Sequence, residues 1–317
     1  MTEEFNKSVS IIIPTRNEAD TLEECLKSIL AQSISPLEII IVDGGSTDNT
    51  LEIAEKYAAR IIKEGEFASP ANARNLGAEN AKGDVLLIMD ADIMLEKNCL
   101  GQALELFKDR NVIAVVPNES NSNHSYLEVI QRKWNEGSRT PINIGLRNAK
   151  ISGLVFFVRK KVFEKVRFNT AYGFGEDDDF STRVEREFNG YKILNAENCK
   201  VISHLPHTLK ELATRYMWWG RTFPAYFVKH FSLKSILNLG SLILPLAVLL
   251  LLLTLFVLPQ TTIIFIIFIS LFVAQILIAC FRSKSVFFLQ FAFFDVVRSI
   301  FFTVGLIEST FVTKKGR

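Results

Sequence analysis

The stretch that most constrains the fold runs from Gly83 to Asp92 and reads Gly-Asp-Val-Leu-Leu-Ile-Met-Asp-Ala-Asp. An apolar run that leaves a Gly-Asp turn and stops at two carboxylates one residue apart is typical of a buried strand ending at the edge of a sheet. Ligands of α/β proteins bind at such an edge. Asp90 and Asp92 repel each other without a cation, and Mg²⁺ or Mn²⁺ takes oxygen ligands from carboxylates and from the phosphates of a substrate. The pattern therefore predicts a metal site, and the alternative is an acidic first turn of a helix.

Strands, loops and helices alternate through the N-terminal part of the chain. Residues 9–14 and 38–42 are short apolar runs rich in isoleucine, and each precedes a polar loop and a predicted helix. This alternation predicts an α/β domain with a parallel sheet and crossover helices. Asn17 is placed to cap the first of these helices, with Asp20 as the acid of a capping box.

Two polar residues in this part are candidates for binding a nucleotide. Asp43 follows the second strand and precedes Gly44, where the backbone can approach a ligand closely. Its carboxylate either accepts hydrogen bonds from a ribose or a base, or belongs to an ordinary turn. Arg74 lies in a helix predicted to begin at Pro70, and it either holds a diphosphate or is a solvated surface arginine.

Four motifs follow one another within about the first hundred residues. They are Pro14-Thr15-Arg16-Asn17-Glu18, Val42-Asp43-Gly44-Gly45-Ser46-Thr47-Asp48, Ala73-Arg74-Asn75-Leu76-Gly77 and Asp90-Ala91-Asp92. In order and spacing they resemble the N-terminal motifs of family 2 glycosyltransferases, whose GT-A fold is Rossmann-like with a mostly parallel sheet. The resemblance implies that Asp92 binds the metal–diphosphate unit. It also implies that the nucleotide and the donor sugar are bound by Pro14, Thr15, Asn17, Glu18, Asp43, Gly44, Arg74, Asp90 and Ala91.

Four consecutive acids, from Glu176 to Asp179, follow a Gly-Phe-Gly sequence. Adjacent carboxylates raise one another's pKa by repulsion, which favours a proton acceptor near neutral pH; the alternative is the acidic start of a solvated helix. A Glu-Asp pair followed by an acid and an arginine resembles the catalytic motif of the same family. The resemblance implies that Asp177 is the catalytic base, that Glu176 positions the acceptor, and that Arg183 pairs with the acids.

His204 ends a predicted short strand. By the resemblance it is a further metal ligand, since neutral imidazole suits Mn²⁺; a structural histidine is the alternative, and His207 is close enough to be confused with it. The polar segment 118–150 is predicted to be acceptor-side structure with a short helix near 126–134. Gly153, in the strand that follows, is assigned to the acceptor side as well.

The C-terminal part of the chain is apolar. Residues 236–258 and 263–281 carry no charge, and each can cross about 30 Å of hydrocarbon as a helix, while a buried core helix is the alternative. A third segment, 286–308, contains Asp295 and Arg298 and precedes a basic tail. A full crossing would bury both charges and export the tail. We therefore expect two spans and an interfacial or re-entrant third helix.

A predicted amphipathic helix at 209–221 precedes the first of these segments and ends in Trp218, Trp219 and Arg221. Paired tryptophans and an arginine suit the headgroup layer before a membrane span, and packing against the sheet is the alternative. On the first interpretation these three residues lie on the acceptor side.

Charge and cysteine content exclude some classes of protein. A formal net charge of +2 without a basic arm argues against a nucleic-acid partner. The cysteines, at positions 25, 99, 199 and 280, have neither metal nor disulfide spacing, which favours a reduced, cytosolic setting. Residues 1–8 are polar and acidic, unlike a signal peptide.

Together these features predict a cytosolic GT-A domain at 1–207, an interfacial helix at 208–235 and a membrane module at 236–317. The expected reaction moves a sugar from a nucleoside-diphosphate sugar to a hydroxyl of a lipid or lipid-linked acceptor at the cell membrane. Mg²⁺ or Mn²⁺ is the expected cofactor, and the anomeric carbon is inverted. Two alternatives stay open: transfer to a polyprenyl phosphate, and a membrane scaffold that retains an inactive nucleotide-binding fold.

Overall fold

The computed structural model describes residues 8–65, 68–120, 129–131, 133, 151, 155–206, 208–229, 239–240, 243–248, 250–251, 262–282 and 288–312. The chain divides into two compact units, the first formed by 1–122 with 145–204 and the second by 123–144 with 205–317. The first unit ends near the domain boundary expected at 207. Most of segment 118–150, predicted to be acceptor-side structure with a short helix near 126–134, lies outside the described residues.

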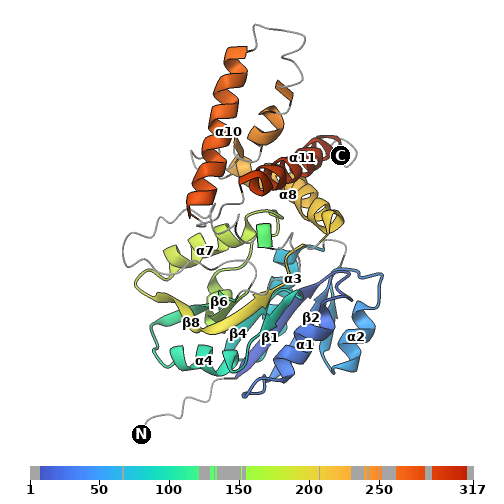
Figure 1. Cartoon of the computed structure of the whole chain (residues 1–317). Coiled ribbons are helices and arrows are strands. Elements are labelled where there is room, and N and C mark those ends of the chain that lie inside the picture. The colour runs from blue at the N-terminus through green and yellow to red at the C-terminus, as the bar shows by residue number, and fades with distance from the viewer. Residues whose placement is uncertain are drawn as a thin grey trace. The chain divides into compact units, whose positions relative to one another are not determined.

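One sheet, whose strands run from blue to yellow in Figure 1, forms the centre of the first unit. Among the described residues it has eight strands in the order β3-β2-β1-β4-β7-β6-β8-β5. The strands are β1 (Val9–Thr15), β2 (Glu38–Asp43), β3 (Arg60–Lys63), β4 (Val85–Met89), β5 (Ile93–Leu95), β6 (Val112–Glu119), β7 (Val155–Arg159) and β8 (Lys192–Ser203). Pairs from β3 through β4, and β6 with β8, are parallel, whereas β7 and β5 pair antiparallel to their neighbours. The predicted α/β fold is confirmed, with a mixed sheet.

Helices cover both faces of this sheet. α1 (Leu22–Leu30), α2 (Thr50–Lys56) and α4 (Cys99–Leu106) pack on one face, and α3 (Pro70–Asn80), α6 (Lys160–Lys165) and α7 (Glu176–Glu187) pack on the other. Alternate residues of β1 enter the two cores, so that Ile11 contributes to the first and Ile12 to the second. α3 lies so close to β1 that a Cβ on Gly77 would be 2.3 Å from Cγ2 of Ile12, so this position requires glycine.

The parallel strands end together at one edge of the sheet. Thr15 of β1 is opposite Asp43 of β2, and the backbone N of Gly44 donates to the carbonyl O of Thr15 at 2.9 Å. β4 pairs with β1 on its other side and ends at Met89, so the turn that carries Asp90 lies at the same edge. This is the edge at which α/β sheets bind ligands.

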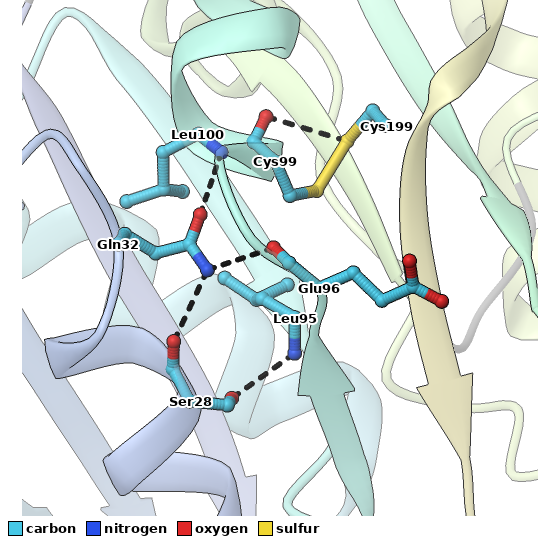
Figure 2. Close-up of a disulfide and its surroundings, with 7 residues drawn as sticks. All are labelled: Ser28, Gln32, Leu95, Glu96, Cys99, Leu100 and Cys199. Carbon is cyan, nitrogen blue, oxygen red and sulfur yellow. Dashed lines mark hydrogen bonds between the residues drawn. A yellow bond between two sulfur atoms is a disulfide. The ribbon is translucent and has the colours of Figure 1, made fainter.

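Cys99 and Cys199 form a disulfide in the first unit, which Figure 2 shows with its surroundings. The two residues are 100 positions apart in the sequence, and their Cα atoms are 4.5 Å apart. The expectation that the cysteines are all reduced is therefore wrong for this pair. The pairing of β5 with β8 brings the two sulfurs together, and sequence spacing does not reveal a pairing of that kind.

The second unit is helical, with α8 (Leu209–Lys229), α10 (Thr262–Arg282) and α11 (Phe288–Val312). α8 and α11 are in backbone contact. A Cβ on Gly220 would lie 2.0 Å from the carbonyl O of Phe302, and one on Gly305 would lie 1.9 Å from that of Met217. Small residues on both helices thus allow this close approach.

α8 is longer than the helix predicted at 209–221. Trp218, Trp219 and Arg221 were predicted to end the helix, whereas it continues to Lys229 because aromatic residues recur at helical spacing beyond the tryptophans. Nε of Arg221 donates to Oε2 of Glu308 on α11 at 2.6 Å. The tryptophans therefore lie in the middle of a helix that packs against α11.

Among the described residues, one helix is long and apolar enough to cross a membrane, Gln290–Ser309 within α11. A shorter apolar helix, Ile266–Phe281, lies in α10. Most of the first expected span, 236–258, lies outside the described residues. The helix Gln290–Ser309 overlaps segment 286–308, for which the sequence favours an interfacial or re-entrant position over a full crossing.

The two charged side chains in the middle of α11 have partners within the second unit. Asp295 and Arg298 form an ion pair with each other, and Nε2 of Gln275 on α10 donates to the Asp295 carboxylate at 2.6 Å. The free-energy cost of burying charges in an apolar environment is lower for such a pair than for two isolated charges.

Candidate active site

Asn17 connects the loops that follow β1 and β2. Its backbone is left-handed, with φ of 58°. Oδ1 of its side chain accepts a hydrogen bond from the backbone N of Thr47 at 2.8 Å, and its own backbone N donates to Oγ of Ser46 at 2.9 Å. The expected helix cap is wrong: α1 begins at Leu22 after Thr21, and the Asn17 side chain is used by the neighbouring loop instead.

Glu18 is held between the same two loops. Its backbone N donates to Oγ1 of Thr50 at 2.9 Å, and its carboxylate accepts from Oγ1 of Thr21 at 3.1 Å. Pro14 and Thr15 precede it at the end of β1, which pairs with the end of β2. The structure thus brings the predicted nucleotide-binding residues of the two loops side by side.

Asp43 is buried, with 2% of its surface exposed. Its carboxylate accepts hydrogen bonds from the backbone N of Gly45 at 3.1 Å and of Ser46 at 3.2 Å. These hydrogen bonds are those of an ordinary turn residue, which is the alternative given above for Asp43. Contact between Asp43 and a ribose or a base stays a prediction. Gly45 has φ of 86°, which favours glycine, while a Cβ on Gly44 would lie 3.2 Å from Oε2 of Glu64.

Arg74 links two groups of predicted site residues. From α3, its Nη2 lies 3.0 Å from Oδ1 of Asp90 and its Nη1 lies 2.9 Å from Oε1 of Glu176. Arg74 is 3% exposed, and its guanidinium carbon lies 5.3 Å from the ring centroid of Phe168. The alternative of a solvated surface arginine is therefore wrong. Contact between Arg74 and a diphosphate stays a prediction.

The four consecutive acids form the first turn of α7. Glu176 and Asp179 are buried, whereas Asp177 and Asp178 are half-buried. One turn along the helix, Nε of Arg183 donates to Oδ2 of Asp179 at 2.8 Å. The cluster therefore divides into two buried acids with arginine partners and two that are more accessible.

Burial raises the pKa of Glu176 above its usual value. The positive charge of Arg74 acts in the opposite direction, and the neighbouring Asp177 adds to the increase. Repulsion between adjacent acids, which predicts a shift in the same direction, is a smaller cause than desolvation. Glu176 is thus held in place by Arg74, and Asp177 is the more exposed member of the Glu-Asp pair.

Asp90, Ala91 and Asp92 form the turn between β4 and β5. The turn is closed by a hydrogen bond from the backbone N of Ile93 to the carbonyl O of Asp90 at 3.2 Å. The backbone N of His204, just after β8, donates to the carbonyl O of Asp92 at 2.9 Å. Strand pairing therefore brings the two predicted metal ligands to adjacent positions.

The chemistry of this donor pair fits Mg²⁺ or Mn²⁺ when a substrate phosphate supplies further ligands. Carboxylate oxygen and imidazole nitrogen are both suitable partners for such ions. In the part of the chain that the structure describes, no three His, Cys, Asp or Glu side chains are grouped closely enough to hold a metal ion. Nε2 of His204 lies 3.7 Å from Oε2 of Glu24 on α1. A cation at Asp92 and His204 would therefore depend on oxygen atoms of a diphosphate.

The residues assigned to the acceptor side fall in different parts of the chain. Gly153, like His207, lies outside the described residues. Trp218, Trp219 and Arg221 belong to α8 in the second unit. Their role toward an acceptor stays a prediction.

Three residues of the site were missed by the sequence analysis. The hydroxyls of Ser46 and Thr50 receive backbone hydrogen bonds from the β1 loop, and the signal for them was a loop rich in Ser, Thr and Asn. Phe168 packs against the Arg74 guanidinium and stacks on Phe180 of α7, with ring centroids 4.2 Å apart. No local pattern marks Phe168, because packing between distant segments brings it to the site.

The sequence is similar to that of known glycosyltransferases. The family model described as glycosyl transferase family 2 matches residues 10–167. A PGL/p-HBAD biosynthesis glycosyltransferase from Mycobacterium bovis is 33% identical over 183 residues, which are 55% of this chain and 68% of that protein. An O-antigen chain rhamnosyltransferase from Salmonella anatum is 28% identical over 226 residues, 67% of this chain and 71% of that protein. For two further bacterial glycosyltransferases the matched part spans 42% and 63% of their length.

A solved structure is similar over nearly the whole chain. It is a mannosyltransferase from Pyrobaculum calidifontis, in complex with GDP-Man and Mn²⁺. The TM-score is 0.57 at 17% identity, covering 96% of this chain and 88% of that one. At this identity the likeness supports the fold, and the family follows from the sequence matches. The chain therefore belongs to glycosyl transferase family 2, and its first unit has the GT-A fold.

Proposed function

We propose that this enzyme transfers a sugar from a nucleoside-diphosphate sugar to a hydroxyl of a lipid or lipid-linked acceptor, with inversion at the anomeric carbon. The observation that carries the proposal is the position of Arg74. It joins Asp90, on the proposed donor side, to Glu176, which precedes the proposed base Asp177. A buried ion-paired link of this kind would hold the donor and acceptor groups at a fixed separation, as a single displacement requires.

In the proposed reaction, the Asp177 carboxylate takes the proton of the acceptor hydroxyl. The hydroxyl oxygen forms its bond to the anomeric carbon while the bond from that carbon to the diphosphate oxygen breaks. Attack on the face opposite the leaving group inverts the configuration. Asp92 and His204 would hold Mg²⁺ or Mn²⁺, which when bound neutralises charge on the leaving diphosphate.

Three observations support the donor, the cation and the membrane-associated acceptor. The solved neighbour from Pyrobaculum calidifontis contains GDP-Man and Mn²⁺. The names of two relatives refer to an O-antigen chain and to PGL biosynthesis. The second unit contains a helix that is apolar enough to cross a membrane. We infer that the enzyme works at the cell membrane with its catalytic unit on the cytoplasmic side, where sugar nucleotides are made.

The acid cluster distinguishes a hydroxyl acceptor from a polyprenyl phosphate. A phosphate monoester is already ionised near neutral pH and needs no base, whereas a hydroxyl is a poor nucleophile until its proton is removed. The half-buried Asp177 beside Glu176 therefore favours a hydroxyl.

The test compares Asp177→Asn with Asp178→Asn, since the two residues are adjacent and both half-buried. A screen of sugar nucleotides for thermal stabilisation with Mn²⁺ first identifies the donor. We expect Asp177→Asn to lower kcat by about a hundredfold to ten-thousandfold without changing donor affinity, and Asp178→Asn to have little effect. The product should be a glycoside that is stable to mild acid.

Two outcomes would favour the alternatives. An acid-labile sugar phosphate on a polyprenyl chain, formed equally fast by Asp177→Asn, would identify a polyprenyl-phosphate glycosyltransferase. Absence of both transfer and hydrolysis of any sugar nucleotide by the wild-type protein in detergent would identify a scaffold.

A further inference from the structure

β5 holds one end of the proposed cation site, and it is only three residues long. On one edge it pairs antiparallel with β8, with Ile93 opposite Ser203. The ladder extends one step further to the hydrogen bond from His204 to Asp92. The relative position of Asp92 and His204 therefore depends on where β5 lies against β8.

The other edge of β5 is held by side chains of the α1 segment, as Figure 2 shows. Oγ of Ser28 accepts from the backbone N of Leu95 at 3.0 Å, and Nε2 of Gln32 donates to the carbonyl O of Glu96 at 2.9 Å. Oε1 of Gln32 also accepts from the backbone N of Leu100 at 3.2 Å. Ser28 thus supplies the hydrogen bond that a neighbouring strand would make to β5, and Gln32 holds the backbone that follows the strand.

These contacts hold β5 on the side that β8 leaves open. Gln32 is 9% exposed, so its amide makes these bonds with little competition from water. At the end of β5 remote from Asp92, the Cys99–Cys199 disulfide and the hydrogen bond from the N of Glu96 to the O of Lys200 close the pair of strands. A three-residue strand without such support would open locally at low cost in free energy.

We propose that Ser28 and Gln32 are positioning residues for the binding of a divalent cation together with a nucleoside diphosphate. They act through the backbone of β5, which fixes the Asp92 carboxylate relative to His204. This inference rests on the proposed function, because it assumes that Asp92 and His204 bind the cation. Groups that orient metal ligands without touching the metal change its affinity by about 10- to 100-fold when they are removed.

The test measures the binding of Mn²⁺ by electron paramagnetic resonance in the presence of saturating GDP or UDP, using the full-length protein in detergent. Gln32→Leu keeps the size of the side chain and removes its hydrogen bonds, and Ser28→Ala is the milder variant. We expect the Mn²⁺ Kd to rise by about 10- to 100-fold in Gln32→Leu and to rise in Ser28→Ala. Nucleotide affinity in EDTA should stay unchanged, which a general loss of structure would not produce.

Ser10→Ala serves as the matched control. Ser10 is also buried, and its hydroxyl accepts from the backbone N of Gly83 at 2.8 Å and donates to Glu38 at 2.7 Å, at the opposite end of β1 from the site. Its loss should lower Tm without changing the Mn²⁺ Kd.

The inference is overturned if Gln32→Leu and Ser28→Ala leave the Mn²⁺ Kd within about twofold of the wild type, or if Ser10→Ala raises it as much at equal loss of Tm. If the wild-type protein binds nucleotide equally well with Mn²⁺ and with EDTA, the proposed role of the cation is itself wrong. If only the variants fail to change the Mn²⁺ Kd, the role of the cation stands and the positioning role of Ser28 and Gln32 is wrong. If Gln32→Leu does not fold, Ser28→Ala decides the question.

Discussion

Arg74 shows how burial changes the role of a charged residue. A sequence containing Ala-Arg-Asn predicts either a surface arginine or a ligand of a diphosphate, whereas the structure encloses the guanidinium between Asp90, Glu176 and Phe168. Buried charges of this kind are strongly destabilising when one partner is removed. The ion pairs therefore fix Glu176, proposed to lie on the acceptor side, to the turn of Asp90, proposed to lie on the donor side.

The shifted pKa of Glu176 predicts a pH dependence of stability. Because its pKa is raised in the folded state, its contribution to stability is fully present below the unfolded-state pKa of about 4.5 and is lost as the pH rises through the higher folded-state pKa. Glu176→Gln resembles the protonated form and does not titrate. The difference in Tm, variant minus wild type, should therefore increase from pH 4.5 toward neutral pH.

Calorimetry of both proteins across this range checks the prediction. Asp178→Asn, which removes a half-buried acid from the same turn, serves as the control and should show a smaller change. A difference in Tm between Glu176→Gln and the wild type that is constant with pH would contradict the assigned cause.

Asp92 provides a second prediction at the level of a residue. A single carboxylate with one imidazole is too small a ligand set to hold Mg²⁺ or Mn²⁺ tightly, so cation and nucleotide should bind together. In Asp92→Asn, the Kd for the nucleotide should be the same in Mn²⁺ and in EDTA, and turnover should be lost. Asp84→Asn, at the other end of β4 and exposed, should behave as wild type. Full wild-type activity in excess chelator would show that the reaction needs no cation.

At the level of elements, the sequence predicts a strand correctly where its pattern is complete within a short segment. β1, β2 and β4 each contain at least three consecutive apolar residues, and each ends at a polar loop that can be recognised without the rest of the chain. β5 could not be predicted in this way, because three residues carry no period and the strand exists only through β8 and α1. The same long-range pairing places His204 beside Asp92.

The Cys99–Cys199 disulfide is an element-level feature with a measurable effect. A bond that joins residues 100 positions apart restricts the unfolded chain, and removing such a bond typically costs about 2–5 kcal/mol. Cys199→Ser should therefore lower Tm in non-reducing buffer. A reductant that is present while the protein unfolds, when the buried bond becomes exposed, should lower the wild-type Tm to the same value and leave the variant unchanged. Peptide mapping without reduction should recover the two residues in one cross-linked species, and two free thiols at these positions would contradict the pairing.

For the whole molecule, the disulfide indicates an oxidising compartment, whereas the proposed reaction indicates the reducing cytosol. Persistent disulfides are rare in a reducing cytosol, yet sugar nucleotides are made there. Both cysteines are fully buried, with 0% of their surface exposed, which limits access by a cellular reductant. A test of the proposed orientation at a membrane is therefore kept separate from a test of the redox state.

The positive-inside rule predicts this orientation. Basic residues lie before the first apolar segment and after the last, where the tail contains Lys314, Lys315 and Arg317, so the tail and the first unit should share the cytoplasmic side. Single cysteines introduced as Glu52→Cys, on the exposed surface of α2, and as Gly316→Cys report the two positions in a Cys280→Ala background. An impermeant maleimide should label both in inside-out vesicles and neither in intact cells. Labelling of the tail only from outside would mean that α11 crosses the membrane completely, with the Asp295–Arg298 pair and Gln275 as the contacts that make the crossing possible.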